Sequence, residues 1–114
     1  MKKTAATALA WTFIVVIVSC SKSDDPPASA CDAVPKSFSA DVNPLIQTFC
    51  NQAGCHATGS TNGPGPLTNY SQVFTHRVAI RGAVQSGLMP QNTTLTAAQK
   101  NIIICWIDSG APNN

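Results

Sequence analysis

Residues 50–59 read CNQAGCHATG, in which two cysteines stand five positions apart and a histidine directly follows the second. This places two thiols and one imidazole within seven residues, in a chain that has only two histidines. Gly54 lies just before the second cysteine, where a residue without a Cβ permits a tight bend. The stretch therefore predicts a loop that presents Cys50, Cys55 and His56 to one common group.

The pattern is a lengthened form of the haem-attachment sequence C-x-x-C-H. In that sequence each thiol bonds to one vinyl group of haem, and the histidine ligates iron from the proximal side. Because His56 follows Cys55 directly, attachment there carries the imidazole beneath the porphyrin without an extra loop. The spacing here is two residues longer, and Gly54 lets the inserted residues bulge outward. We expect one covalent haem c on Cys50 and Cys55.

A six-coordinate haem for electron transfer takes a second ligand, commonly methionine, on its other face. The part of the chain after the N-terminal apolar run contains one methionine, Met89, in the loop sequence G-L-M-P. Met89 is therefore the expected distal ligand, and the alternative for a lone methionine is core packing. His76 is the other candidate for this position, although a histidine beside Val73 and Ile80 is more often structural. Arg77 and Arg81, four residues apart, are candidates for pairing with the haem propionates, or are simply solvated.

The N-terminal segment predicts export and lipid anchoring. Lys2 and Lys3 precede an apolar run from Ala5 to Val18, which is typical of a secretory signal and is shorter than a membrane-spanning helix. The ending I-V-S-C resembles the lipobox of bacterial lipoproteins, so we expect a signal peptide over 1–19 and acylation of Cys20. An ordinary cleaved signal and a membrane span remain the alternatives. The polar, proline-containing residues that follow predict a flexible tether, and we assign 20–37 to a lipid-anchored tether before the domain.

The net charge and the number of cysteines narrow the possible functions and partners of the protein further. Without Lys2 and Lys3 the chain is near neutral and has no basic stripe, so we expect no nucleic-acid partner. An exported protein meets an oxidising compartment, where spare thiols tend to pair. Once Cys20 and the two motif cysteines are assigned, Cys31 and Cys105 remain and are expected to form a disulfide. Two separate thiols are the alternative.

From Asp32 onward the hydrophobic pattern predicts short helices joined by loops, with no sustained alternation typical of strands. The predicted fold class is all-α, with three to four short helices. The expected helices cover about 41–49, 69–85 and 97–109, and the glycine- and proline-rich residues 57–66 form a loop. The last helix has the clearest limits, because Thr96 and Gln99 form a capping-box pattern and Gly110 supplies a stop. Ile104 lies on the polar side of that helix, where the pattern does not explain it.

Taken together, the motifs resemble those of a known family. The order C-x4-C-H, L-T-N-Y, G-L-M-P, L-T-A-A-Q-K and I-C-W-I-D-S-G-A-P-N-N is similar to small class I cytochrome c domains of bacterial envelope lipoproteins, including the planctomycete-type group. The resemblance covers about Phe38 to Asn114, which we assign as the cytochrome c-like domain 38–114. It implies a small helical cytochrome c fold in which the first and last helices cross beside the haem. It also implies His56 and Met89 as axial ligands, with Tyr70 and Trp106 near the ring.

The expected function is electron transfer by this haem in a protein held at the membrane of the cell envelope, facing the periplasm or the cell surface. The expected partners are other redox proteins of the envelope. We do not expect an enzyme, because two axial ligands leave no open position on the iron. One alternative is a haem enzyme or gas sensor whose sixth position is open. Another is a haem-free lipoprotein in which Cys50 and Cys55 form a disulfide or help to hold a metal.

Overall fold

The C-terminal helix, α4 (Ala97–Asp108), begins where the capping pattern predicts. The Thr96 side chain accepts a hydrogen bond from the Gln99 backbone N–H at 3.2 Å, and the Gln99 side chain accepts one from the Thr96 N–H at 2.8 Å. These reciprocal bonds satisfy two N–H groups that a helix start otherwise leaves without partners. The helix ends at Asp108, one residue before the expected end.

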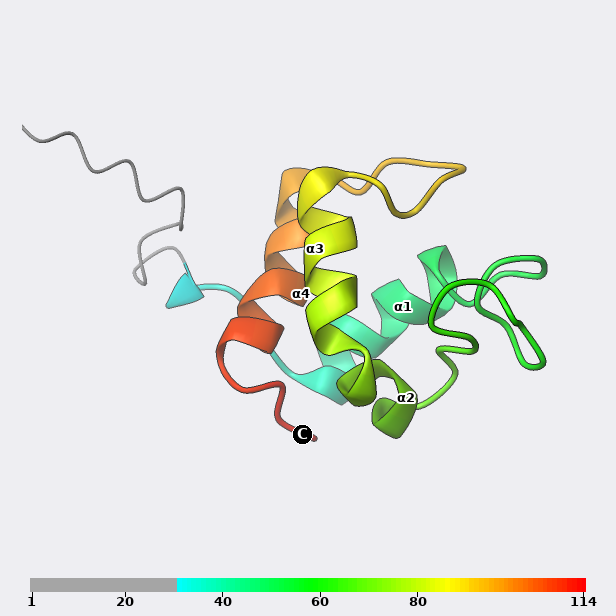
Figure 1. The fold of residues 1–114 in the computed structure, drawn as a ribbon. Coiled ribbons are helices and arrows are strands. Elements are labelled where there is room, and N and C mark those ends of the chain that lie inside the picture. The colour runs from blue at the N-terminus through cyan, green and yellow to red at the C-terminus, as the bar shows by residue number, and fades with distance from the viewer. Residues whose placement is uncertain (1–30) are drawn as a thin grey trace, which may run out of the picture.

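The computed structural model describes residues 31–114, and these contain four α-helices and one π-helical turn but no strand (Figure 1). The all-α prediction is therefore confirmed for the described part of the chain, as is the number of short helices. In chain order the elements are η2 (Phe38–Val42), α1 (Asn43–Phe49), α2 (Tyr70–Thr75), α3 (Arg77–Ser86) and α4. Residues 57–66 form a loop, as expected.

The first helical segment begins earlier than the sequence predicts. The expected start was Asp41, whereas the π-helical turn η2 begins at Phe38 and runs directly into α1. Ser37 caps this turn, because its hydroxyl accepts a hydrogen bond from the Ala40 N–H at 3.3 Å. Asn114, at the other end of the domain, also accepts the Phe38 N–H at 2.8 Å through its side chain. A contact between residues so far apart in sequence leaves no local signal.

The single helix expected over 69–85 is wrong, because the chain forms two helices that break at His76. The His76 backbone (φ −100°, ψ 10°) leaves the helical conformation. Arg77 stabilises the break: its guanidinium donates to the Phe74 carbonyl at 2.8 Å and stacks over the Phe74 ring at 4.1 Å. An arginine thus supplies a partner at the point where the helix ends. Gly87 (φ 77°) then ends α3 in a left-handed conformation.

The core lies where η2 and α3 pack against α4 (Figure 1). Its largest fully buried side chains are Trp106, Ile46, Ile103, Val42, Val73 and Val84. Phe38 joins η2 to this core, with ring centroids 5.0 Å from Tyr70 and 5.4 Å from Trp106. The C-terminal segment closes over these aromatic rings. The Trp106 indole N–H donates to the Pro112 carbonyl, and the Tyr70 hydroxyl donates to the Ala111 carbonyl, both at 2.9 Å.

Cys31 and Cys105 form a disulfide that ties the start of the described chain to α4. The bond joins residues 74 positions apart. It also accounts for Ile104, which is buried although it lies on the polar side of the α4 pattern. A small cavity there is lined by Ile104 together with Cys31 and Gln85, so the disulfide segment and α3 cover this side of α4.

The predicted signal peptide (1–19), the acylated Cys20 and the tether up to residue 30 lie outside the described residues. Within residues 31–114, no helix has the length and apolar character needed to cross a membrane.

Candidate functional site

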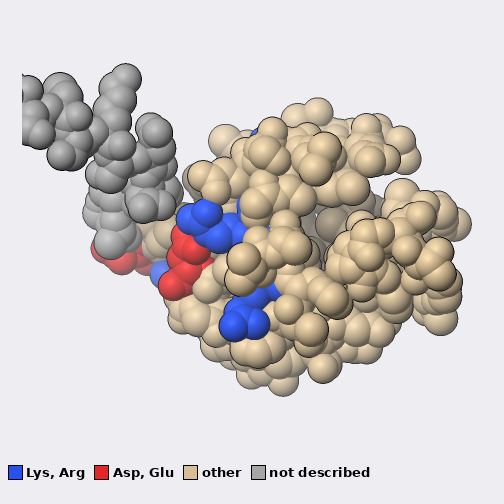
Figure 2. All heavy atoms as spheres, in the orientation of Figure 1, with Lys and Arg blue, Asp and Glu red and all other residues tan. Residues whose placement is uncertain are grey.

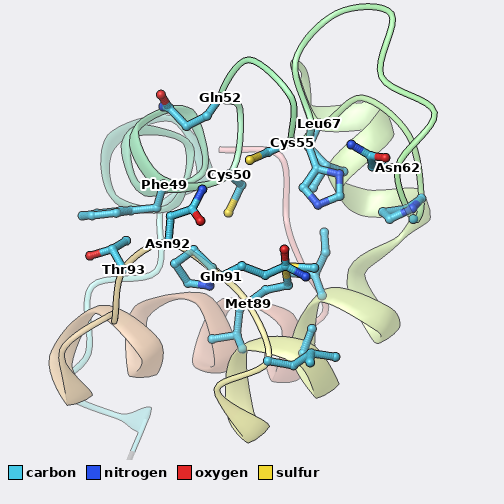
Figure 3. Close-up of a pocket in the computed structure, with 18 of the residues that line it drawn as sticks. Phe49, Cys50, Gln52, Cys55, Asn62, Leu67, Met89, Gln91, Asn92 and Thr93 are labelled. Atoms are coloured by element: carbon cyan, nitrogen blue, oxygen red, sulfur yellow. The ribbon is translucent and has the colours of Figure 1, made fainter.

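A cavity of about 690 Å³ lies between the loop after α1, one face of α3 and the loop that follows α3 (Figure 3). Cys50, Cys55 and His56 line it from the first loop, and Met89 lines it from the second. Figure 3 shows the side chains of Cys50 and Cys55 projecting from their loop on the side that faces Met89. The structure thus brings the four residues predicted to hold the cofactor to one cavity.

The loop from Cys50 to His56 is closed by its own backbone. The Cys50 N–H donates to the Ile46 carbonyl, which ends α1, and the His56 N–H donates back to the Cys50 carbonyl at 3.1 Å. Gly54 has a φ of +80°, which favours glycine and allows the chain to reverse between the two cysteines. Cys50 is buried and Cys55 is half-buried, and both are free thiols.

Four residues separate the cysteines, two more than in C-x-x-C-H. Hydrogen bonds from the Gln52 and Asn62 side chains hold this segment in place. The Gln52 amide donates to the Thr48 carbonyl at 2.7 Å and to the Gln47 carbonyl at 3.1 Å, which fixes it to the end of α1. From the opposite side, the Asn62 amide donates to the Gly54 carbonyl at 2.7 Å. The longer spacing therefore forms a defined bulge.

His56 is buried, with only 8% of its surface exposed, and its ring has a fixed orientation. Its Nδ1 lies 2.9 Å from the carbonyl oxygen of Gly65. Because a carbonyl oxygen only accepts hydrogen bonds, Nδ1 carries a proton, and in the neutral imidazole Nε2 therefore keeps its lone pair. The His56 carbonyl also accepts the Leu67 N–H at 2.8 Å, and Gly63 leaves room beside the ring. The neutral tautomer with its proton on Nδ1 leaves Nε2 of His56 able to ligate a metal.

Met89 reaches the cavity from the loop after α3. Its backbone N–H donates to the Ala83 carbonyl at 3.1 Å, which holds the loop close to the last turn of the helix. The side chain is half-buried and lies near the centre of the group of residues in Figure 3. A thioether in this position faces the cavity rather than the packed core.

Burial raises the pKa of the Cys50 thiol from 9.0 to about 11, and the neighbouring Cys55 adds to the shift. The raised pKa keeps this thiol protonated at neutral pH. A zinc site would require the thiolate form of the cysteine, so the environment of Cys50 works against one. Within the described range, no three Cys, His, Asp or Glu side chains are grouped so as to hold a metal ion.

The remaining predicted residues do not line the cavity. Tyr70 and Trp106 belong to the aromatic cluster beneath the C-terminal segment. His76 is the half-buried residue at the break between α2 and α3.

The two arginines contact other groups of the chain. Arg81 forms an ion pair with Asp108 at 2.7 Å, and Arg77 is placed against Phe74. Arg77 and Arg81 lie four residues apart on α3, as expected. This spacing does not determine which neighbouring groups their side chains contact.

The sequence analysis missed the polar groups that line the cavity near its opening. These are Thr48, Gln52, Asn62, Gln91, Asn92 and Thr93. Only uncharged amides and hydroxyls are present there, and such residues are ordinary in loops, so no sequence signal distinguished them. The apolar lining includes Phe49, Leu67, Ile80, Val84 and Leu88.

Comparison of the chain with protein-family models, with curated proteins and with solved structures found no match.

Proposed function

We propose that the protein transfers electrons through one c-type haem, attached to Cys50 and Cys55, within a small cytochrome c fold. The observation that carries the proposal is the meeting of two cysteines, an oriented imidazole and a thioether in one cavity, from loops more than thirty residues apart. An iron porphyrin bound there would supply a one-electron redox centre.

The residues of the cavity fit such a group. Its volume of about 690 Å³ is within the range of sites for bound cofactors, and its lining combines apolar side chains with a few polar ones. Cys50 and Cys55 would hold the porphyrin by thioether bonds. His56 offers Nε2 as the proximal ligand because Gly65 engages Nδ1. Met89 would supply the distal ligand.

The roles of the other residues follow from their contacts. Gln52 and Asn62 hold the bulge between the cysteines, so that both sulfur atoms face the cavity. Ile80 and Val84 are buried side chains on the α3 face, and they would exclude water from that side of the porphyrin. Because His56 and Met89 would stay bound to the iron in both the ferric and the ferrous state, little structural rearrangement would accompany electron transfer. We further propose a lipid-anchored location in the cell envelope and redox proteins as partners, on the basis of the N-terminal sequence.

Attachment is tested by producing the protein in a host that has cytochrome c assembly machinery. We expect haem to migrate with the polypeptide on a denaturing gel stained for haem peroxidase activity. The variant Cys50→Ala with Cys55→Ala should carry no stain. A colourless wild-type protein, or pigment that acidified organic solvent extracts completely, would disprove the proposal.

Distal ligation is tested on the same material. The ferric protein should show the weak red absorption band of a sulfur-to-iron bond, and Met89→Ala should abolish it. Leu88→Ala is the matched control, since Leu88 is the adjacent residue and carries no ligand atom. A band that survives in Met89→Ala would exclude Met89 as the ligand.

A further inference from the structure

Asn62 and Gly63 form the only Asn-Gly pair of the sequence, and they lie in the loop 57–66. Both residues are exposed. In such a pair the backbone nitrogen of the second residue can attack the side-chain amide carbon of the asparagine, which is one reason why asparagine is thermolabile. A side chain on the second residue would shield that nitrogen, and glycine has none. The attack therefore meets the least steric hindrance at this pair.

The conformation of the loop also leaves the attacking nitrogen accessible. Among residues 31–114, the Gly63 N–H has no hydrogen-bond partner. Its neighbours are bonded: the Asn62 N–H donates to the Ser60 hydroxyl at 3.1 Å, and the Gly65 N–H donates to the Asn62 carbonyl at 2.9 Å. Because the attacking nitrogen must give its proton to solvent, an exposed N–H without a partner favours the reaction.

The other asparagines lack this combination. A residue larger than glycine follows each one that has a successor in the sequence, namely Asn43, Asn51, Asn69, Asn92, Asn101 and Asn113. Asn92 is the closest comparison, because it is also exposed and also lines the cavity from a loop. The β-branched Thr93 follows it and crowds the backbone nitrogen. Asn92 thus provides an internal control.

We propose that Asn62 is a site of spontaneous deamidation. The Gly63 nitrogen attacks Cγ of Asn62, so that an N–Cγ bond forms and the proton of that nitrogen goes to solvent. The Cγ–Nδ2 bond breaks, the leaving nitrogen takes up a proton, and ammonia departs. Water then opens the resulting succinimide ring at either carbonyl, which gives aspartate or isoaspartate. No oxidant or reductant takes part.

Deamidation would remove a contact that holds the segment between the two cysteines. The Asn62 amide donates to the Gly54 carbonyl at 2.7 Å, and Gly54 directly precedes Cys55. This bond restrains the side chain and slows the attack, although the residue remains exposed to water. A carboxylate at position 62 has no N–H to donate, and its oxygens repel the carbonyl oxygen. The reaction would therefore release the segment that leads to Cys55.

Deamidation would also add a negative charge to the lining of the cavity. In the part of the chain that the structure describes, the lining contains no Asp, Glu, Lys or Arg. Figure 2 shows the charged side chains of this face away from the loop 57–66, and the pair Arg81–Asp108 joins α3 to α4. A negative charge beside a bound haem stabilises ferric over ferrous iron and lowers the reduction potential. This consequence rests on the proposed function, whereas the deamidation itself does not.

The test is peptide mass spectrometry of the protein after storage at mildly alkaline pH. The peptide that contains Asn62 should gain the mass difference between a hydroxyl and an amino group. We expect this gain to be at least about tenfold faster than at Asn92, because Thr93 crowds the corresponding nitrogen there. Isoaspartate, labelled by isoaspartyl methyltransferase, should appear at position 62. Equal rates at the two asparagines, or a gain of mass without isoaspartate, would overturn the proposal.

Two variants isolate the cause. Thr93→Gly gives Asn92 the same following residue and should raise its rate toward that of Asn62. If Asn92 stays slow in this variant, the unshielded nitrogen is not the cause and the proposal fails. Asn62→Gln should show no gain of mass at position 62, because the longer side chain would have to close a larger ring. An unchanged rate in this variant would also contradict the mechanism.

The effect of the new charge is tested on the haem-containing protein. Asn62→Asp and Asn62→Ala both lack the bond to Gly54, but only the first adds a charge. We expect a lower reduction potential in Asn62→Asp than in Asn62→Ala at low ionic strength, and a smaller difference at high ionic strength. Equal potentials would refute the effect on the redox centre. Absence of covalent haem would refute the proposed function, whereas the mass measurement on the haem-free chain would still decide the deamidation.

Discussion

Removal of the Cys31–Cys105 disulfide should cost the domain a large part of its stability. The bond joins residues 74 positions apart, so it closes nearly the whole described chain into one loop. Loop-closure entropy for that length is about 15 cal/mol/K, which corresponds to about 4.4 kcal/mol at 25 °C. Small domains have unfolding free energies of about 5–15 kcal/mol, so the loss would be a substantial fraction of the total.

The variant for this test is Cys31→Ser combined with Cys105→Ala. Serine suits the half-buried position 31, whereas alanine at the buried position 105 avoids placing a hydroxyl in the core. Urea unfolding followed by circular dichroism gives the free energy of unfolding and its dependence on urea concentration. We expect a loss of about 4 kcal/mol and a steeper dependence, because the unfolded chain without the bond is more extended.

The control is wild-type protein with the disulfide chemically reduced, which keeps both cysteine side chains and lacks only the bond. If the constraint on the unfolded chain is the cause, the reduced protein and the double variant should lose similar stability. A loss below about 1 kcal/mol in both, with unchanged urea dependence, would refute the entropic reasoning. A loss confined to the double variant would assign the effect to packing around Ile104.

Four further outcomes are expected. The ferrous wild-type protein should resist carbon monoxide and Met89→Ala should bind it, as measured by absorption spectroscopy; ready binding by the wild type would favour an open sixth position. Asn62→Ala removes the bond to the Gly54 carbonyl and should lower the fraction of protein with both thioether bonds, as counted by peptide mass spectrometry, whereas the exposed Thr58→Ala should not. In haem-free folded protein, alkylation of Cys50 should have its midpoint near pH 11 and move toward 9.0 in urea, because burial raises its pKa only in the folded state; equal midpoints would contradict this. The same shift predicts that the haem-free fold loses stability as the pH rises from 9 toward 11, since only the unfolded chain releases the proton in that range.

Local signals in the sequence predicted the elements that local interactions determine. Thr96 and Gln99 located the start of α4 because both partners of the capping box lie within one turn. Gly87 likewise marked the end of α3. The break at His76 was missed because the hydrophobic period continues through it, while the stabilising contact of Arg77 with Phe74 depends on the folded geometry.

The candidate site shows the same division. Adjacency in the chain predicted that Cys55 and His56 act together, and the structure adds the Gly65 carbonyl that fixes the imidazole. Met89 lies in the same cavity, but the distance between its loop and the cysteines cannot be read from spacing. Arg81 lies against Asp108 and does not line the cavity, and spacing could not predict this because it gives relative positions on a helix face and not the direction of that face.

The bonds between Asn114 and the start of η2 set an order for folding. The Asn114 side chain accepts the Phe38 N–H, and its carbonyl accepts the Ser39 N–H, both at 2.8 Å. Phe38 and Asn114 are 76 positions apart, so these bonds form only after the chain has folded back on itself. The Ser37 hydroxyl can cap this turn from the start, whereas the N–H groups of Phe38 and Ser39 gain their partners only when the C-terminal segment is in place.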